Sequence, residues 1–336
     1  MKKIKDIVCS KPISPFWKIL AGLFLLFFSL PSGGSGGAWF GGAFAQQDPH
    51  YSQYMFNQLA VNPAYAGSKE AISAAVFYRN QWTGMPGAPV TETFTIHSPM
   101  RNKKAALGFS VVADKIGPKS SIGAFGSYAY RIKVRDGKLS FGLRVGVYQY
   151  NYNWDLVTHK DQTDNVYIAQ GSEKETIIVP TADAGLYYYT NSMYVGLSIT
   201  HLNNGLSGAL TKKTAAGDYS HLSSHTFFTI GKAWAVSEKL IFNPSCMIKM
   251  AGNSALSFDQ NFSFLYNHRI WMGLSLRSIS GIGVYSQFNI TDKFKIGYAF
   301  DFTYNDAGLA GRGSHEIMIS YDIKTSKPPF FSPRYF

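Results

Sequence analysis

Beyond residue 70, most of the chain alternates between apolar and polar positions with a period of two. In residues 293–303 the apolar face consists of Phe294, Ile296, Tyr298, Phe300 and Phe302. Only a β-strand separates side chains in this way, because successive residues point to opposite faces. Residues 140–148 and 316–324 repeat the pattern, with Arg144 and Glu316 among their polar positions. The sequence therefore predicts strands with one apolar face and one wet face.

Eleven further segments are predicted to be strands, at residues 71–81, 90–98, 105–114, 121–133, 181–189, 193–201, 223–235, 239–249, 256–266, 270–277 and 280–290. The total is about fourteen, an even number as expected of a bacterial single-chain barrel. Two strands are irregular, because Gln260 lies on an otherwise apolar face and residues 226–234 are mixed on both faces.

The connections alternate between tight turns and longer loops, as they do in outer-membrane barrels. Tight connections are predicted at residues 135–138, 190–192, 237–238, 267–268 and 291–292, and longer loops at 153–180, 203–221 and 304–313. The pair Asp136-Gly137 favours a two-residue hairpin turn. Two connections on the long-loop side, at residues 252–255 and 278–279, are short. Because short turns lie on the periplasmic side of such barrels, this alternation predicts that both termini face the periplasm.

Composition agrees with a membrane barrel, since charged residues are 15%, aromatic residues are 15%, and the mean hydropathy is −0.07. Barrel strands average to neutral hydropathy because one face meets lipid and the other meets water. A soluble β-sandwich or β-propeller is the alternative fold. The tyrosines at 148, 150 and 152 together with Trp154 favour the membrane barrel, as an interfacial aromatic girdle.

The N-terminus has the features of a secretory signal. Lysines precede an apolar run at residues 19–30, and Ala43-Phe44-Ala45 fits a cleavage site, so the mature chain is expected to begin near Gln46. An uncleaved anchor is the alternative. Cys246 is then the one cysteine left, which excludes an internal disulfide and favours a packed side chain.

Charge and motifs exclude several function classes. The formal net charge is +12, of which the signal region contributes four, and no arginine-rich block or finger spacing accompanies it. Nucleic acid is therefore a poor partner. His221 and His225 are four apart, but on a strand this spacing separates them by about 13 Å. Ser224 and His225 do not indicate a lipase, because no G-x-S-x-G nucleophile elbow accompanies them. We predict no catalytic residue, no metal and no cofactor.

Residues 46–67 do not alternate and are rich in aromatic and amide side chains. They predict at most a short amphipathic helix before the break at Asn62-Pro63. About fourteen strands leave a lumen that needs water or a plug. We therefore predict that this segment enters the lumen and bonds to inward charges such as Arg144 and Glu316. The expected organisation is a signal at 1–45, a plug segment at 46–70, a barrel at 71–324 and a periplasmic tail at 325–336.

Four stretches carry a family resemblance. They are DPHYSQYMFNQLAVNPAYAG at residues 48–67, YRNQWTGMPGAP at 78–89, the following TETFTIHSPM, and the terminal PFFSPRYF. Together they resemble the PorP/SprF family of outer-membrane proteins from type IX secretion and gliding motility systems of the Bacteroidota. The resemblance implies a non-enzymatic barrel that works with a periplasmic lipoprotein ring, or that pairs with a secreted adhesin through its C-terminal targeting domain. A general diffusion porin or small-molecule transporter is the alternative function.

Candidate residues fall into two groups. The plug and family-motif positions are Asp48, Tyr51, Tyr54, Asn57, Asn62, Pro63, Tyr65 and Gly67. The candidate partner contacts are Arg79, Trp82, Arg334, Tyr335 and Phe336. Trp82 has a second interpretation as an interfacial anchor, and the polar long loops are further candidate contact surfaces.

Overall fold

The computed structural model describes residues 49–153, 156, 174–203, 223–251, 256–278, 281–303 and 311–324. The predicted signal, Asp48, Trp154 and the terminal Arg334, Tyr335 and Phe336 lie outside these residues. Within the described residues, none of the helices has the length and apolar character needed to cross a membrane.

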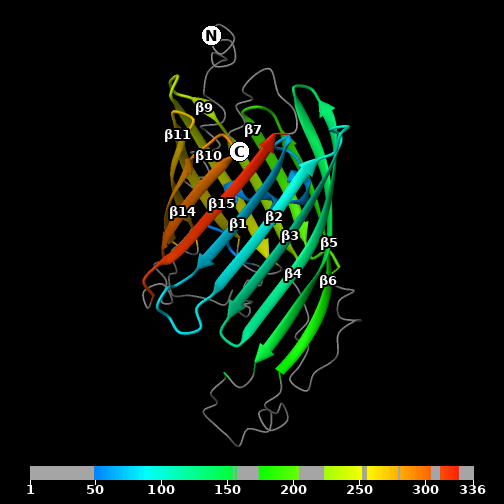
Figure 1. Cartoon of the computed structure of the whole chain (residues 1–336), viewed down its shortest axis with the longest axis vertical. Coiled ribbons are helices and arrows are strands. Elements are labelled where there is room, and N and C mark those ends of the chain that lie inside the picture. The colour runs from blue at the N-terminus through cyan, green and yellow to red at the C-terminus, as the bar shows by residue number, and fades with distance from the viewer. Residues whose placement is uncertain are drawn as a thin grey trace, which may run out of the picture.

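The strands are β1 (Ala71–Asn80), β2 (Val90–Pro99), β3 (Ala105–Ile116), β4 (Lys119–Val134), β5 (Gly137–Asn153), β6 (Lys174–Tyr189), β7 (Met193–Thr200), β8 (His225–Lys232), β9 (Trp234–Ala235), β10 (Leu240–Ala251), β11 (Ser257–Tyr266), β12 (Ile270–Arg277), β13 (Gly281–Asn289), β14 (Phe294–Phe302) and β15 (Ser314–Lys324). Strands that follow one another in the chain pair antiparallel, except that β8 and β9 both pair with β10. β15 pairs with β1, so the sheet closes into the tilted barrel of Figure 1.

The closed barrel has the predicted fourteen strands, because β8 and β9 are two parts of one strand. Both pair with β10, with Gly231 opposite Ser245 and Trp234 opposite Phe242. Pro244 lies opposite the break and has no N–H to donate to the ladder. This explains the mixed pattern around residues 226–234.

The predicted alternation matches the observed exposure. Phe302, Ile317 and Val145 are 57%, 45% and 65% exposed, whereas Glu316 on the polar face of β15 is fully buried. Apolar side chains therefore cover the outside, and charged side chains line the inside. Gln260, which interrupts the apolar face of β11, is only 9% exposed, and its amide nitrogen donates to the carbonyl oxygen of Ser245 at 3.1 Å.

The prediction of a tyrosine girdle on β5 is wrong for the residues that the structure describes. Tyr148 and Tyr150 are each 8% exposed and pack with Phe125 and Val179 inside the barrel. They have the same parity as Arg144, so a strand that turns Arg144 inward must turn them inward as well.

The two ends of the barrel differ in their connections. The end where β2 and β4 finish, at the top of Figure 1, carries six short turns. One is the two-residue turn Arg135-Asp136, closed by the pair Val134 and Gly137, so the turn is centred one residue before the predicted Asp-Gly pair. We call this the short-turn end and the other the long-connection end, since residues 81–89, 154–173, 201–224 and 303–313 connect strands there.

Candidate functional site: a segment inside the barrel

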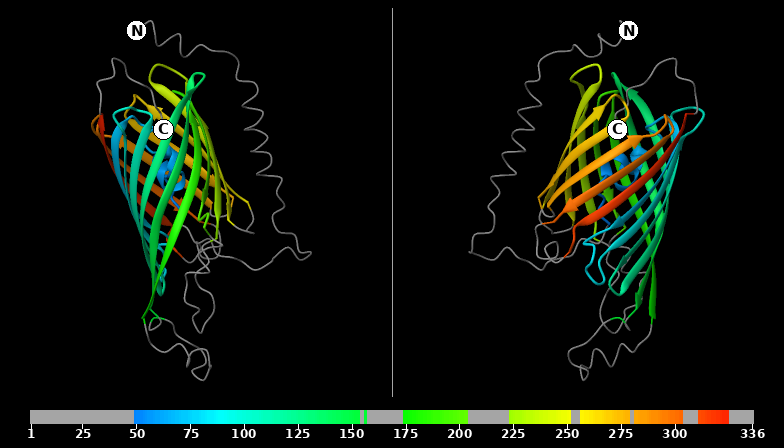
Figure 2. Two further views of the ribbon diagram at one scale, coloured as in Figure 1. Left: turned by 90° about the vertical axis from the view of Figure 1, so that its right-hand side faces the viewer. Right: turned by 60° about the vertical axis from the view of Figure 1, so that its left-hand side comes forward.

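Residues 49–70, here called the inner segment, lie within the ring of strands, where Figure 2 shows them in blue. They form the 3-10 turn η1 (Tyr54–Phe56), the helical turn α3 (Gln58–Val61) and the 3-10 turn η2 (Pro63–Tyr65). Asn62 ends α3 in an extended conformation, as expected of a residue before proline, and its side chain accepts a hydrogen bond from Ala64 N at 2.9 Å. The predicted short helix and Asn-Pro break are therefore present.

The inner segment runs from the long-connection end to the short-turn end. Pro49 and His50 lie beside His225, the first residue of β8, and Lys249, near the end of β10. At its other end Glu70 leads directly into β1. The described chain thus begins at Pro49 at the long-connection end and finishes at Lys324 at the short-turn end.

The carboxylate of Glu316 holds the first part of the inner segment. It accepts hydrogen bonds from Ser52 N at 2.7 Å and Gln53 N at 2.9 Å. The hydroxyl of Ser52 donates to Asp301 and accepts from Arg79. Arg79 also pairs with Glu316 at 3.2 Å and Asp301 at 2.9 Å, so the segment completes a buried charged cluster.

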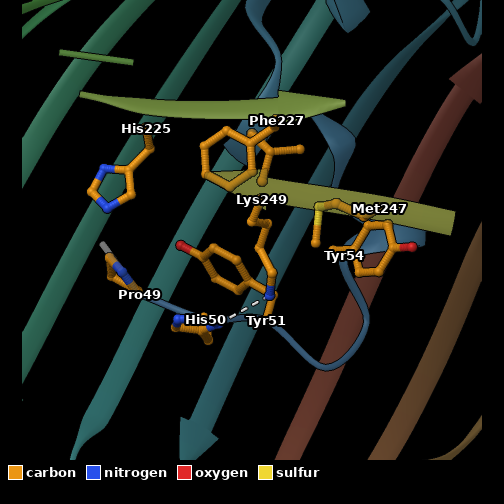
Figure 3. Close-up of a pocket in the computed structure, with 9 residues that line it drawn as sticks. Pro49, His50, Tyr51, Tyr54, His225, Phe227, Met247 and Lys249 are labelled. Carbon is orange, nitrogen blue, oxygen red and sulfur yellow. Dashed lines mark hydrogen bonds between the residues drawn. The ribbon is translucent and has the colours of Figure 1, made fainter. Parts of the chain in front are cut away.

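Further charged side chains of alternating sign extend this cluster along the inner wall of the barrel. Arg277 pairs with Asp301 at 3.0 Å and lies 4.0 Å from Asp259, which pairs with Lys249 at 2.7 Å. Lys249 donates to His50 Nδ1 at 3.3 Å, shown as the dashed line in Figure 3. Loss of solvation and the adjacent positive charge of Lys249 hold the pKa of His50 well below its usual value. A neutral ring is also what the accepting Nδ1 requires.

The middle of the inner segment is bonded to the wall mainly through its backbone. Arg144 donates to the carbonyl oxygen of Ala60 at 2.9 Å and pairs with Asp183. Ser198 Oγ donates to the carbonyl oxygen of Val61 at 2.6 Å. These bonds satisfy carbonyl groups that a four-residue helical turn leaves without a helical partner.

Side chains of the inner segment add further contacts in the same region. The amide of Asn62 donates to the carbonyl oxygen of Leu186 at 3.0 Å. Tyr54 accepts from Asn261 at 2.6 Å, and Tyr51 bonds to Thr93 at 2.9 Å. The rings of Tyr65 and Tyr187 meet edge to face at 5.4 Å between centroids. Polar and aromatic groups therefore share the contact with the wall.

Glycines in the wall make room for the inner segment. A Cβ at Gly142 on β5 would overlap the backbone of Ala64, and one at Gly185 on β6 would overlap the side-chain oxygen of Asn62. A Cβ at Gly297 on β14 would meet the side-chain oxygen of Gln53. Three strands of the barrel therefore carry a glycine where the inner segment lies close, and at Gly142 the close group is backbone.

At the short-turn end Gly67 joins the inner segment to β1. It has φ +68°, which favours glycine, and a Cβ there would overlap Ala106. Its carbonyl oxygen accepts from Arg131, and its N–H donates to His97 Nδ1 at 3.1 Å. Gly67 therefore combines a backbone requirement with a steric one.

The structure brings together seven predicted plug positions: Tyr51, Tyr54, Asn57, Asn62, Pro63, Tyr65 and Gly67, all buried in the barrel. Ser52 and Gln53, which bind Glu316, were not predicted, and neither were the wall glycines. Of the candidate partner contacts, Arg79 is buried and bonds to Ser52. Trp82 lies at the long-connection end with φ +51°, and its N–H donates to Ser314 Oγ at 3.1 Å.

Space for a ligand is small beside the inner segment. A cavity of about 20 Å³ lies between His50, Tyr51, His225 and Lys249 (Figure 3). This is room for about one water molecule. Among the described residues, no group of three histidine, cysteine or acidic side chains has the arrangement of a metal site.

An apolar outer surface, a closed ring of strands and a charged interior together define a membrane β-barrel. Residues 43–321 match the sequence profile of the family described as type IX secretion system membrane protein PorP/SprF. The chain belongs to this family and is an outer-membrane β-barrel of the type IX secretion system. Membership implies that other components of the system are among its partners. Among curated proteins, none matches the sequence.

Several solved structures resemble the barrel at low sequence identity. Omp33 of Acinetobacter baumannii is 9% identical with a TM-score of 0.41, covering 75% of this chain and 98% of its own. A FadL homologue of Pseudomonas aeruginosa is 12% identical with a TM-score of 0.41, covering 82% and 95%. The toluene transporter TodX of Pseudomonas putida is 10% identical with a TM-score of 0.44, covering 79% and 93%. Values this low carry no conclusion about function.

Proposed function

We propose that this protein is a non-catalytic adaptor of type IX secretion whose lumen is closed by its own inner segment. In this role it would assist the secretion or surface retention of a partner protein, such as a gliding adhesin with a C-terminal targeting domain. Family membership supports the secretion role. The observation that carries the closed lumen is the contact of the inner segment with the wall at both ends and in the middle, through Glu316, Arg144 and Arg131.

The charges of the wall also favour closure over conduction. A diffusion pore needs charged side chains that face water across an open lumen. Here Arg79, Arg277 and Lys249 are each paired with wall carboxylates and buried. A barrel of fourteen strands is about 28 Å across at the backbone. The inner segment places buried aromatic side chains such as Tyr54 and Tyr65 in that space.

The orientation in the membrane is part of the proposal. Outer-membrane barrels keep their longer connections outside the cell and their short turns in the periplasm. By this rule Lys324 faces the periplasm and Pro49 lies toward the cell surface. The proposed orientation differs from the expectation that both termini are periplasmic. That expectation came from the connections between strands, whereas the inner segment crosses the lumen before β1 begins.

Contact with a secreted partner is proposed for the long-connection end. Trp82 is only half-buried there, and its backbone N–H donates to Ser314, the first residue of β15. Arg79, by contrast, faces inward, and its proposed role is to hold Ser52. The terminal Arg334, Tyr335 and Phe336 remain proposed contacts for a periplasmic partner. Loss of that partner on deletion of residues 325–336 would support them.

Two measurements on the same preparation test the proposal. Native purification followed by mass spectrometry is expected to recover a large secreted protein together with other type IX components. Purified wild-type barrel in planar bilayers is expected to show no stable conductance, and deletion of residues 49–66 is expected to open it. Stable conductance of the wild-type protein without a co-purifying protein would instead support the diffusion porin or small-molecule transporter.

A further inference from the structure

A ring of exposed cations surrounds the short-turn end, and we call it the basic rim. Its members are Arg101, Lys103, Lys104, Lys133, Arg135, Lys239, Arg269 and Lys293. They lie in or beside five of the six short turns, and the turn between β6 and β7 carries none of them. Three exposed acidic residues, Asp136, Glu238 and Asp292, lie in the same turns, which leaves a net charge of +5.

The basic rim is unpaired, unlike the cations inside the mouth. Lys138 pairs with Glu70, while Lys69 and Lys295 both lie near Asp322. Among the residues that the structure describes, no ion pair involves any of the eight rim cations. Unpaired, solvated charges at a surface cost little to keep, and they are the ones available to a partner.

Three of the rim turns are held by a side-chain oxygen that accepts from the backbone of a rim lysine. Asn102 Oδ1 accepts from Lys104 N at 3.0 Å, and Thr291 Oγ1 accepts from Lys293 N at 3.2 Å. Ser237 Oγ accepts from Lys239 N at 3.4 Å and Leu240 N at 3.1 Å. The backbone that carries these charges is therefore pre-organised, which lowers the cost of binding.

The same turns also expose apolar side chains. Met100, Val236 and Ile290 are 45%, 63% and 49% exposed, and each precedes one of the three held turns. An apolar side chain beside a cation is the combination found in protein interfaces, where burial supplies affinity and charge supplies specificity.

The positive charge is not spread evenly over the chain. Residues 154–173, which connect β5 and β6 at the other end, contain four acidic residues and one lysine. Of the exposed charged residues that the structure describes around that end, Lys115 and Arg312 are positive and Glu92 is negative. The excess positive charge of the barrel therefore gathers at the short-turn end.

We propose that the basic rim binds an acidic face of another protein, which covers the short-turn mouth. This rests on the proposed adaptor function, which places that mouth in the periplasm. Lys69, Lys138 and Lys295 are partly exposed inside the mouth, where lipid around the barrel has no access, and they outnumber Glu70 and Asp322, the two carboxylates near which they lie. A mouth about 28 Å across presents roughly 600 Å², close to one side of a standard protein interface.

The test uses the full-length protein in its own bacterium, with a photo-crosslinking residue placed at Met100 or Ile290. These positions lie next to the basic rim and leave its charges unchanged. Ile116, 42% exposed at the long-connection end, is the control position. The rim variant combines Lys103→Glu and Lys293→Glu, and the matched control, which reverses the same number of charges at the long-connection end, combines Lys115→Glu and Arg312→Glu. Heat-dependent mobility in detergent gels verifies that each barrel is folded.

We expect crosslinks at Met100 and Ile290 to one periplasmic protein, within acidic peptides, and none of these at Ile116. The rim variant and salt of about 0.5 M should each reduce the yield at least tenfold, and the control variant should not. Crosslinks to lipid alone, or to a protein whose yield the rim variant leaves unchanged, would overturn the inference. If the crosslinks at Met100 and Ile290 are absent while the wild-type protein still retains the secreted protein and stays closed, the rim inference fails and the adaptor function stands.

Discussion

Glu316 and Ser52 lie 264 positions apart in the chain, yet the carboxylate of Glu316 accepts the backbone N–H of Ser52 at 2.7 Å. Glu316 is fully buried and pairs with Arg79, and its carboxylate makes the bond to Ser52 charge-assisted. β15 therefore holds Ser52 and Gln53, near the start of the inner segment.

Replacing Glu316 with glutamine should loosen this attachment. Arg79 loses one of its two carboxylates, and removal of one partner from a buried charged cluster costs about 3 kcal/mol. We expect that decrease in the free energy of unfolding, measured in urea, together with faster proteolysis near Pro49. Glu92→Gln on the outer face of β2 is the control and should change neither. Equal stability of the two variants would contradict the anchoring role.

Gly142 offers a test of the fit between wall and inner segment. A Cβ at this position overlaps Ala64, so Gly142→Ala should displace the segment at a cost of about 1–3 kcal/mol. Conductance in planar bilayers should appear or increase. Gly126→Ala on β4 is the matched control, because a Cβ there meets no atom within 4 Å. A closed Gly142→Ala barrel with a protected segment would argue against the fit.

Acid should release the start of the inner segment. His50 is neutral in place, since loss of solvation and Lys249 depress its pKa, with Arg277, Arg79 and His225 adding to the effect. A released His50 regains a pKa of about 6.5. Its contribution is constant above that pH, and each unit below it favours release by up to about tenfold. Proteolysis near Pro49 should accelerate between about pH 6.5 and 5. His50→Gln should remove that dependence.

Trp82 should matter for partner capture more than for stability. Its side chain is half-buried at the long-connection end, so Trp82→Ala should change the free energy of unfolding by less than about 1 kcal/mol while reducing co-purification of the secreted protein. Trp271→Ala is the contrasting variant, because Trp271 is buried against Phe56 and its loss should cost about 3 kcal/mol or more. A large loss of stability for Trp82→Ala would favour the membrane-anchor interpretation.

The strands were predictable because the barrel imposes a simple period on each of them. Ile317 is exposed and Glu316 is buried because successive residues of a strand point to opposite faces of the sheet. This alternation is visible in the sequence. The prediction for Tyr148 was wrong because tyrosine is suited both to an interfacial girdle and to a barrel lumen. Its residue type favoured the outer face, whereas its position in the alternation of β5 favoured the inner face, where it lies.

The inner segment was predictable as a segment but not in its contacts. Its departure from alternation and its Asn62-Pro63 break were visible. Ser52 and Gln53 bind through backbone N–H groups, which every residue but proline possesses, so no side-chain pattern marks them. The wall glycines were hidden for a related reason, because small residues are common on the inner face of barrel strands and only the position of Ala64 distinguishes Gly142.

The bond between Glu316 and Ser52 also constrains the order of assembly. β15 is the last strand among the described residues and closes the ring against β1, and Glu316 faces Arg79 across that seam. The bonds of Glu316 to Ser52 and Gln53 can form only when β15 arrives. Docking of the start of the inner segment on Glu316 therefore cannot precede the arrival of β15 at the seam.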